Sequence, residues 1–282
     1  MERMSQVVRL LLALVAVLAA VPGLAQAGDK AVARVVAFGG ACAKCELSGR
    51  KLAGARFIGA DFTGAALVGS DLRESKILGS SFAKADLSRA DLSESAAMGA
   101  SFAQANLSNA RLRSAEVHGV NFAGANLSGG DLAEMEAAGA NFLGAQLTNA
   151  SLRSAELRGA NLNRVNAAGA DFRDAELVGA VLAAGRFDGV SFRDADLAGA
   201  QLSGASFVRA DFREASLRRT LVAGVDLSQA RGLTQDQLDE ACGDARTRLP
   251  QGLSVRSCGV RIIVHAPAPP PGAPRHLVEI DP

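Results

Sequence analysis

Every fifth residue from Leu47 to Leu227 is apolar, without a break in register. Of these 37 positions, 31 hold Leu or Phe. An amphipathic helix needs apolar residues at i, i+3, i+4 and i+7, and a half-buried strand needs strict alternation, so neither explains a period of five. A short period kept over this length is typical of a solenoid, in which each repeat stacks on its neighbours.

Each unit of five has a common pattern around its apolar residue. A small residue, most often Ala, lies two positions before it, and a polar residue lies directly before it, as in Ala60-Asp61-Phe62. Alternate residues of an extended segment share a face, so the small and the large residue are both expected to point inward. Gly often follows two positions later, which suits a tight corner. The chain is therefore expected to turn a corner every five residues.

Tandem units of the form Ala-(Asp/Asn)-Leu-x-x, as at residues 85–87 and 105–107, resemble the pentapeptide-repeat family. The resemblance implies an all-β solenoid, a right-handed quadrilateral β-helix with four units per coil. A recurrence of twenty residues supports this, since Phe62, Phe82 and Phe102 are spaced by one such coil. We expect about nine coils, with stacked residues ~4.8 Å apart and a core of Leu and Phe too narrow for a ligand.

The first residues have the features of a secretory signal. Arg3 and Arg9 precede an apolar run at residues 10–21, and Ala25-Gln26-Ala27 follows a Pro-Gly break. The alternative, a membrane anchor, would need a longer apolar run. We expect cleavage before Gly28 and a periplasmic or secreted protein without a membrane span. Without the signal, the chain has 28 basic and 28 acidic residues.

The C-terminal part departs from the repeat. Thr234 to Gln237 has the form of a capping box, which predicts a helix through about Cys242 with Gly243 as its stop. This segment resembles a C-terminal extension of other exported pentapeptide-repeat proteins, and we interpret it as a cap on the solenoid edge. The expected organisation is a signal at 1–27, an N-terminal strand or cap at 28–46 with a strand at Val32 to Phe38, repeats at 47–231, a helical cap at 232–264 and a Pro-rich tail at 265–282.

Four cysteines flank the repeats. A solenoid would separate Cys42 and Cys45 from Cys242 and Cys258 by tens of Å, whereas a disulfide needs Cα atoms within about 7 Å. We therefore expect the disulfides Cys42–Cys45 and Cys242–Cys258. The alternative is a redox protein that uses Cys42-x-x-Cys45, but no helix is predicted to start there, and a zinc site would need further ligands nearby.

One corner of the coils is predicted to be charged. Its basic members fall on one lattice of twenty residues, and we call them the arginine column: Arg73, Arg113, Arg153, Arg173, Arg193 and Arg213. Acidic residues occupy the next position, as at Glu74 and Glu134, and a separate acidic column contains Glu116 and Glu136. Interleaved charges of opposite sign would relieve repulsion along the stack. The arrangement is either a solvated salt-bridge ladder or a docking face for a partner.

The composition excludes several classes of function. The sequence has three His and no nucleophile elbow, phosphate loop or metal-binding His pair, so we expect no enzyme, cofactor or metal. Known relatives imitate DNA and act on gyrase, but that role needs an acidic surface, and residues 47–230 have 19 basic and 20 acidic residues. Thr is sparse in the coils, and Trp and Tyr are absent, which disfavours ice and sugar binding. The favoured hypothesis is an exported, non-enzymatic structural or protein-binding rod that binds no nucleic acid.

Overall fold

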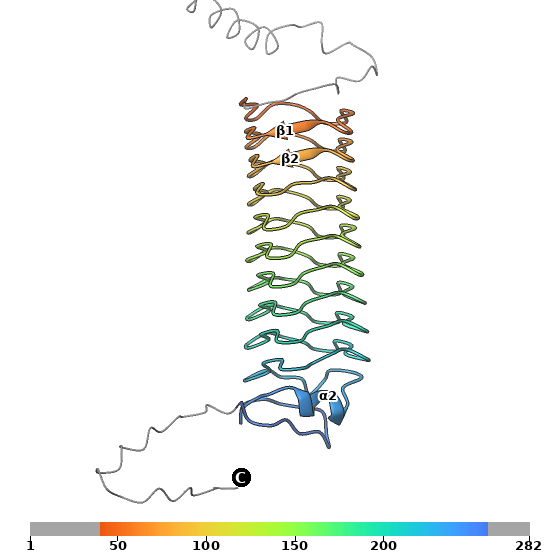
Figure 1. Cartoon of the computed structure of the whole chain (residues 1–282). Helices are drawn as coiled ribbons and strands as arrows, with labels where there is room; N and C mark the ends of the chain where they lie inside the picture. Colours follow the sequence, from red (N-terminus) through yellow and green to blue (C-terminus); the bar gives the residue numbers. More distant parts are fainter. Residues whose placement is uncertain (1–39, 259–282) are drawn as a thin grey trace, which may run out of the picture.

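The computed structural model of the chain describes residues 40–258, which stack coil upon coil into a long column (Figure 1). Parallel bridges join residues twenty apart, such as Asp61 to Ser81 and Asp86 to Asn106. Each coil contributes four such bridges, because bridged residues recur every five positions and each belongs to a different side. The chain is thus an all-β solenoid with four sides, as the resemblance to the pentapeptide-repeat family implies and the recurrence of twenty residues supports.

Two strands are long enough to be named. Strand β1, Arg56–Ile58, pairs in parallel with β2, Lys76–Leu78, and places Phe57 beside Ile77. On the other sides of the described coils a single residue is bridged before the chain turns again, because a unit of five leaves room for only a short extended segment. The solenoid is therefore held together by many short contacts between coils.

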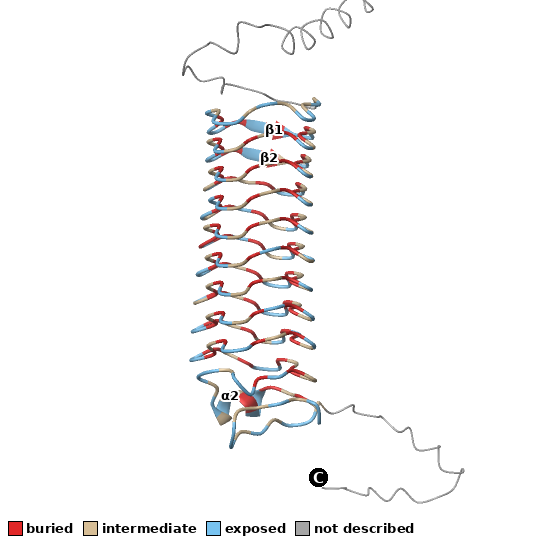
Figure 2. Cartoon of the chain, turned by 180° about the vertical axis from the view of Figure 1, so that it is seen from behind, coloured by how far each residue is buried: buried red, intermediate tan, exposed pale blue. Residues whose placement is uncertain are grey.

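The interior is filled by the two inward residues of each unit. The Ala and the Leu or Phe positions are buried from Leu52 to Leu227 (Figure 2). Phe62, Phe82, Phe102, Phe122 and Phe142 form a column of stacked rings with centroids 4.8–5.4 Å apart. The core is thus continuous from the first coils to the last, which agrees with the close packing expected of a protein interior.

The corners are β-turns. In the unit of Phe62, the Ala65 N–H donates to the Phe62 carbonyl at 2.9 Å, and Gly64 has φ +68°. The expectation that Gly makes the corners is correct only in part, since other corners have non-Gly residues at positive φ, among them Glu74 at +56° and Arg219 at +55°. A single left-handed residue is tolerated where a hydrogen-bonded turn requires it.

Helix α2, Gln235–Glu240, interrupts the coils after the last complete one. The predicted capping box is present, since the Thr234 side chain accepts from the Gln237 N–H and the Gln237 side chain accepts from the Thr234 N–H. The predicted end is wrong: the helix ends at Glu240, Ala241 is extended, and Gly243 does not form the stop. The cause is β pairing, because the Cys242 N–H donates to the Thr220 carbonyl and thereby draws the chain back onto the last coil.

The chain beyond α2 continues to pair with the solenoid. Leu221 bridges to Cys242 and Asp226 bridges to Arg248, so the spacing grows beyond twenty residues where the helix is inserted. The Gln237 side-chain amide also donates to the Phe212 and Ala215 carbonyls, at 2.9 and 2.8 Å. The expected signal, the strand at 32–38 and the Pro-rich tail lie outside the described residues.

Candidate functional site

Both predicted disulfides are present. The Cα atoms are 5.4 Å apart in Cys42–Cys45 and 4.8 Å apart in Cys242–Cys258. Cys42 and Cys45 are partly buried and pack against the hydrophobic core. This pair begins the first described coil of the solenoid and does not open a helix, so its surroundings differ from those of a thioredoxin-like motif.

The arginine column follows one side of the solenoid. Its members each lie one residue after the inward Leu or Phe of that side, and parallel bridges such as Asp71 to Asp91 and Asp171 to Ser191 keep this side in register from coil to coil. Arg73, Arg113 and Arg213 have 54, 48 and 57% of their side-chain surface exposed. The structure therefore brings the six predicted residues onto one face.

The partners of the arginine column differ from those expected. Arg73 binds Asp71, with Nη2 2.8 Å from Oδ2, and Arg173 and Arg213 bind Asp171 and Asp211 in the same way. The reason is that residues on either side of an inward residue both point outward and lie next to each other. The position after the arginine is the corner, and only Arg113 reaches such a carboxylate in the described residues, that of Glu134 at 2.6 Å.

The aspartates of this face are held in the ionised form. Hydrogen bonds from the Arg73 side chain hold the pKa of Asp71 below its ordinary value, and those from Arg213 do the same to the pKa of Asp211. The arginine side chain of each pair is about half exposed, so solvent screens the pair and it contributes little to folding. Much of the positive charge of the arginine column is thus neutralised by its own chain.

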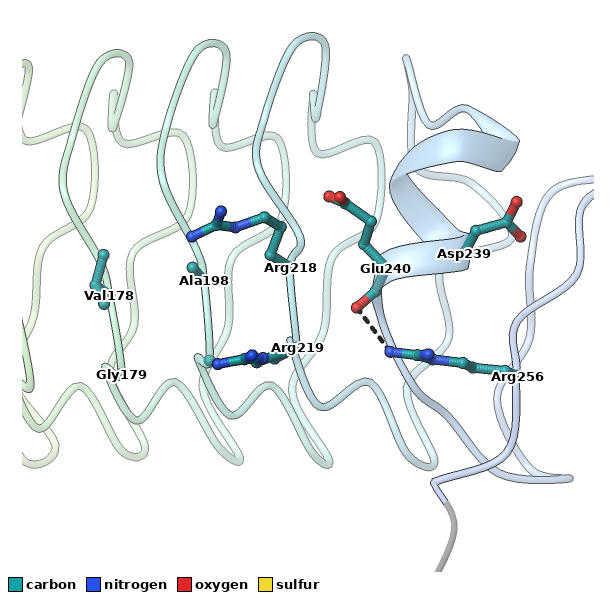
Figure 3. A pocket seen from close by; sticks show the side chains of 9 residues that line it. Val178, Gly179, Ala198, Arg218, Arg219, Asp239, Glu240 and Arg256 are labelled. Atoms are coloured by element: carbon teal, nitrogen blue, oxygen red, sulfur yellow. Dashed lines mark hydrogen bonds between the residues drawn. The ribbon is translucent and has the colours of Figure 1, made fainter.

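A groove lies where α2 meets the last coils, and sequence reasoning missed it. It has a volume of about 590 Å³ and is open to solvent. We call it the arginine groove, because it is lined by Arg218, Arg219 and Arg256, together with Val178, Gly179, Ala198, Gly199, Asp239 and Glu240. Figure 3 shows the side chains of Arg218 and Arg219 both extending from their coil toward the preceding one, where the end of Arg218 lies beside Ala198. Two consecutive arginines at a coil corner were the available signal in the sequence.

Arg256 is fixed at the edge of the arginine groove. Its Nε donates to the Ala241 carbonyl at 3.1 Å, and its Nη2 donates to the Glu240 carbonyl at 3.4 Å (Figure 3). The Arg219 N–H also donates to the Glu240 carbonyl, at 2.7 Å. A guanidinium is favourable at the C-terminal end of a helix because the terminal carbonyls are otherwise unpaired.

A second depression of about 620 Å³ lies on another side of α2, next to Arg213 and Gly232. Gly232 has φ +74°, and a Cβ there would lie 2.9 Å from the Arg213 backbone nitrogen. The close approach of these two segments of the chain thus requires Gly at position 232. Arg213, the last member of the arginine column, thus borders the junction between coil and cap.

Residues 40–258 contain a single histidine, His118. His118 is exposed and has Nε2 3.2 Å from Glu136 Oε2 on the outer surface. Residues 40–258 contain no set of three or more Cys, His, Asp or Glu side chains arranged to hold a metal ion. Within the same residues no helix is long and apolar enough to cross a membrane. The other two histidines, His265 and His276, lie outside this part.

Comparisons with known proteins agree with this architecture. A family model described as pentapeptide repeats matches in eight copies, over residues 42–77, 79–113, 98–129, 115–153, 155–194 and 191–229. The solved structure of HetL, a pentapeptide repeat protein involved in regulation of heterocyst differentiation in the cyanobacterium Nostoc sp. strain PCC 7120, is 30% identical, with a TM-score of 0.66. The match covers 74% of this chain and 92% of HetL.

Two further solved structures are similar with lower scores. A pentapeptide repeat protein of the Arabidopsis thaliana thylakoid lumen is 30% identical over 38% of this chain and 70% of its own, with a TM-score of 0.29. The plasmid-mediated fluoroquinolone resistance protein QnrB1 is 18% identical over 60% of this chain and 89% of its own, with a TM-score of 0.35. No curated protein matches the sequence significantly.

Proposed function

This chain belongs to the pentapeptide-repeat family, and from that premise we propose that it is an exported, non-enzymatic rod that binds another protein. The observation that carries the proposal is the filled interior, since the inward residues are buried from Leu52 to Leu227 and leave the outer faces for interaction. The two depressions at α2 are open grooves on the surface and suit contact with another chain. Flat solenoid faces commonly serve as binding surfaces.

The proposed rod is a right-handed β-helix of about nine coils, with residues 232–264 as its cap. The twenty-residue spacing of the bridges from Ala41 to Arg231 supports the number of coils. The contacts of α2 with the last coil support the cap, because Gln237 bonds to two carbonyls of that coil. Covering the last edge in this way would prevent pairing with other chains.

Export is proposed from the first 27 residues and supported by the two disulfides, which persist in oxidising compartments. Cell fractionation followed by N-terminal sequencing tests it. We expect the mature chain outside the cytoplasm, beginning at Gly28. A full-length chain that still carries its first residues and stays in the cytoplasm would overturn this part of the proposal.

Protein binding is tested by affinity capture from the extracytoplasmic fraction with the native chain and two variant baits. The first bait replaces the six residues of the arginine column by Ala, and the second replaces the exposed corner residues Arg89, Arg164 and Arg209 by Ala. We expect the native chain to enrich the same protein reproducibly, and the second bait to retain it. Recovery no greater than with an unrelated solenoid would contradict the proposal. Loss with the first bait alone would place the contact on the arginine column.

A further inference from the structure

We propose that the arginine groove binds an acidic, extended segment of a partner protein. The inference rests on the proposed protein-binding function and specifies the site and the chemistry of the partner. The arginines of the column and those of the groove differ in whether a carboxylate pairs with them. Arg73, Arg173 and Arg213 each bind an Asp of their own coil. Within residues 40–258, neither Arg218 nor Arg219 has a carboxylate oxygen within 4.0 Å of its guanidinium.

The difference follows from the local sequence. Asp71 and Arg73 flank an inward residue, and the corresponding residue before Leu217 is Ser216, so Arg218 has no carboxylate beside it on its own coil. Arg219 takes the corner position that Gly179 and Gly199 occupy in the two preceding coils. Because those glycines have no side chain, the space over which the two arginines extend stays open (Figure 3).

The groove is held in shape by the cap. Arg256 bonds to the carbonyls of Ala241 and Glu240 at the end of α2, and the Arg219 N–H bonds to Glu240 from the solenoid side. The groove therefore presents guanidinium groups from two separate parts of the chain on a fixed backbone. A carboxylate placed between Arg218 and Arg219 could accept hydrogen bonds from both, and such charge-assisted bonds are among the strongest in proteins.

The remaining lining residues define the class of ligand. Val178 is 38% exposed and offers an apolar contact beside the charges. Asp239 and Glu240 line the groove on the side of α2, and Glu176 and Asp196 lie two positions before Val178 and Ala198 on the same side of the solenoid. These carboxylates would repel a nucleic acid or another dense polyanion. A peptide with a few carboxylates and small apolar residues can place its carboxylates beside the arginines and its apolar residues beside Val178, with less repulsion from the carboxylates of the groove.

The test measures binding of a fluorescein-labelled six-residue peptide, in which Glu and Ala alternate, to the purified full chain by fluorescence anisotropy, at about 20 mM ionic strength where screening is weak. The groove variant is R218A/R219A. The matched control is R89A/R209A, which removes the same charge from exposed corner residues whose φ values, +60° and +59°, are close to that of Arg219. Thermal unfolding of each variant confirms that it is folded. A labelled DNA duplex serves as the second probe.

We expect the native chain to bind the alternating Glu-Ala peptide, the groove variant to lose about tenfold or more in affinity, and the control to lose less than about twofold. In E240Q, which removes a competing carboxylate from the groove wall, binding should tighten. Equal losses in both double variants, or no binding by the native chain, would overturn the proposal, as would tighter binding of the DNA probe. If the affinity capture fails while the native chain still binds the alternating Glu-Ala peptide, the proposed cellular function is contradicted and the peptide-binding groove is not.

Discussion

At the N-terminal end the outermost described coil, which contains Ala41, Glu46 and Arg56, is bridged within residues 40–258 only to the coil that follows it. At the C-terminal end the last coil is covered by α2 and by the chain beyond it, which the Cys242–Cys258 disulfide closes into a loop. The middle coils repeat almost the same contacts. One repeat can thus form the same contacts at every position in the middle of the stack, whereas the two ends of the solenoid are each built differently.

The core differs between the ends as well. In the N-terminal half, Ser70, Ser75 and Ser95 occupy inward positions, and their hydroxyls have no hydrogen-bond partner among the described residues. In the last coils the buried Thr220 hydroxyl donates to the Leu197 carbonyl at 2.8 Å. A buried polar group without a partner costs free energy. We therefore expect the N-terminal coils to open more readily than the C-terminal ones.

The largest effect is expected from the aromatic core. Phe142→Ala, in the middle of the stack, should lower the free energy of unfolding by about 3–5 kcal/mol, because it leaves a cavity between coils that cannot move apart. Phe62→Ala, near the N-terminal end, should cost less, since the outer coil can fray independently. Urea unfolding of both variants measures the difference. Equal losses would mean that the two regions unfold as one and that the comparison is wrong.

Loss of the C-terminal disulfide is expected to lower the free energy of unfolding more than loss of the N-terminal disulfide. Replacing Cys242 and Cys258 by Ala should cost about 3 kcal/mol on the loop-entropy model, and replacing Cys42 and Cys45 should cost about 2 kcal/mol because the closed loop is much shorter. Thermal unfolding under non-reducing conditions gives both values. If replacing Cys42 and Cys45 lowers the stability more than replacing Cys242 and Cys258, the C-terminal end is not the more stable one.

Replacing the buried serines is expected to have a smaller effect on stability, and in the opposite direction. Ser70→Ala, Ser75→Ala and Ser95→Ala should each raise the free energy of unfolding by about 1 kcal/mol, because a buried hydroxyl without a partner is removed. Ser80→Ala is the matched control, since the Ser80 hydroxyl accepts from the Ala60 N–H at 3.1 Å and donates to the Phe57 carbonyl at 3.0 Å. That variant should be destabilised. Stabilisation by Ser80→Ala would show that pairing of the hydroxyl is irrelevant.

The smallest expected effect is an acid sensitivity of the cap. Hydrogen bonds from Arg246 lower the pKa of Asp244 to about 2, and the Gly224 N–H also donates to this carboxylate. Because the folded pKa lies below the unfolded one, the stabilisation is present above the ordinary Asp pKa and is lost as the pH falls toward 2. The melting temperature of D244N should therefore fall less between pH 5 and pH 2 than that of the native chain. Asp194→Asn, at an exposed corner, is the control for the removal of one surface carboxylate.

The sequence predicts the interior of the solenoid well and its surface less well. Positions such as Phe62 and Phe82 repeat a single local environment, so their period reveals which residues point inward, and the stack then restricts how the cysteines can pair. The ion pairs were not predictable in detail, because whether Arg113 reaches Glu134 depends on side-chain positions between coils. The arginine groove depends on where α2 lies on the last coil, which no period describes.

Hydrogen exchange followed by mass spectrometry tests the difference between the ends most directly, because it reports the opening of each segment separately. The account predicts that peptides spanning residues 42–57 exchange first, and that those spanning residues 212–248 stay protected nearly as long as the middle coils. Earlier exchange in the α2 region than at the N-terminal coils, or uniform protection along the whole stack, would contradict it.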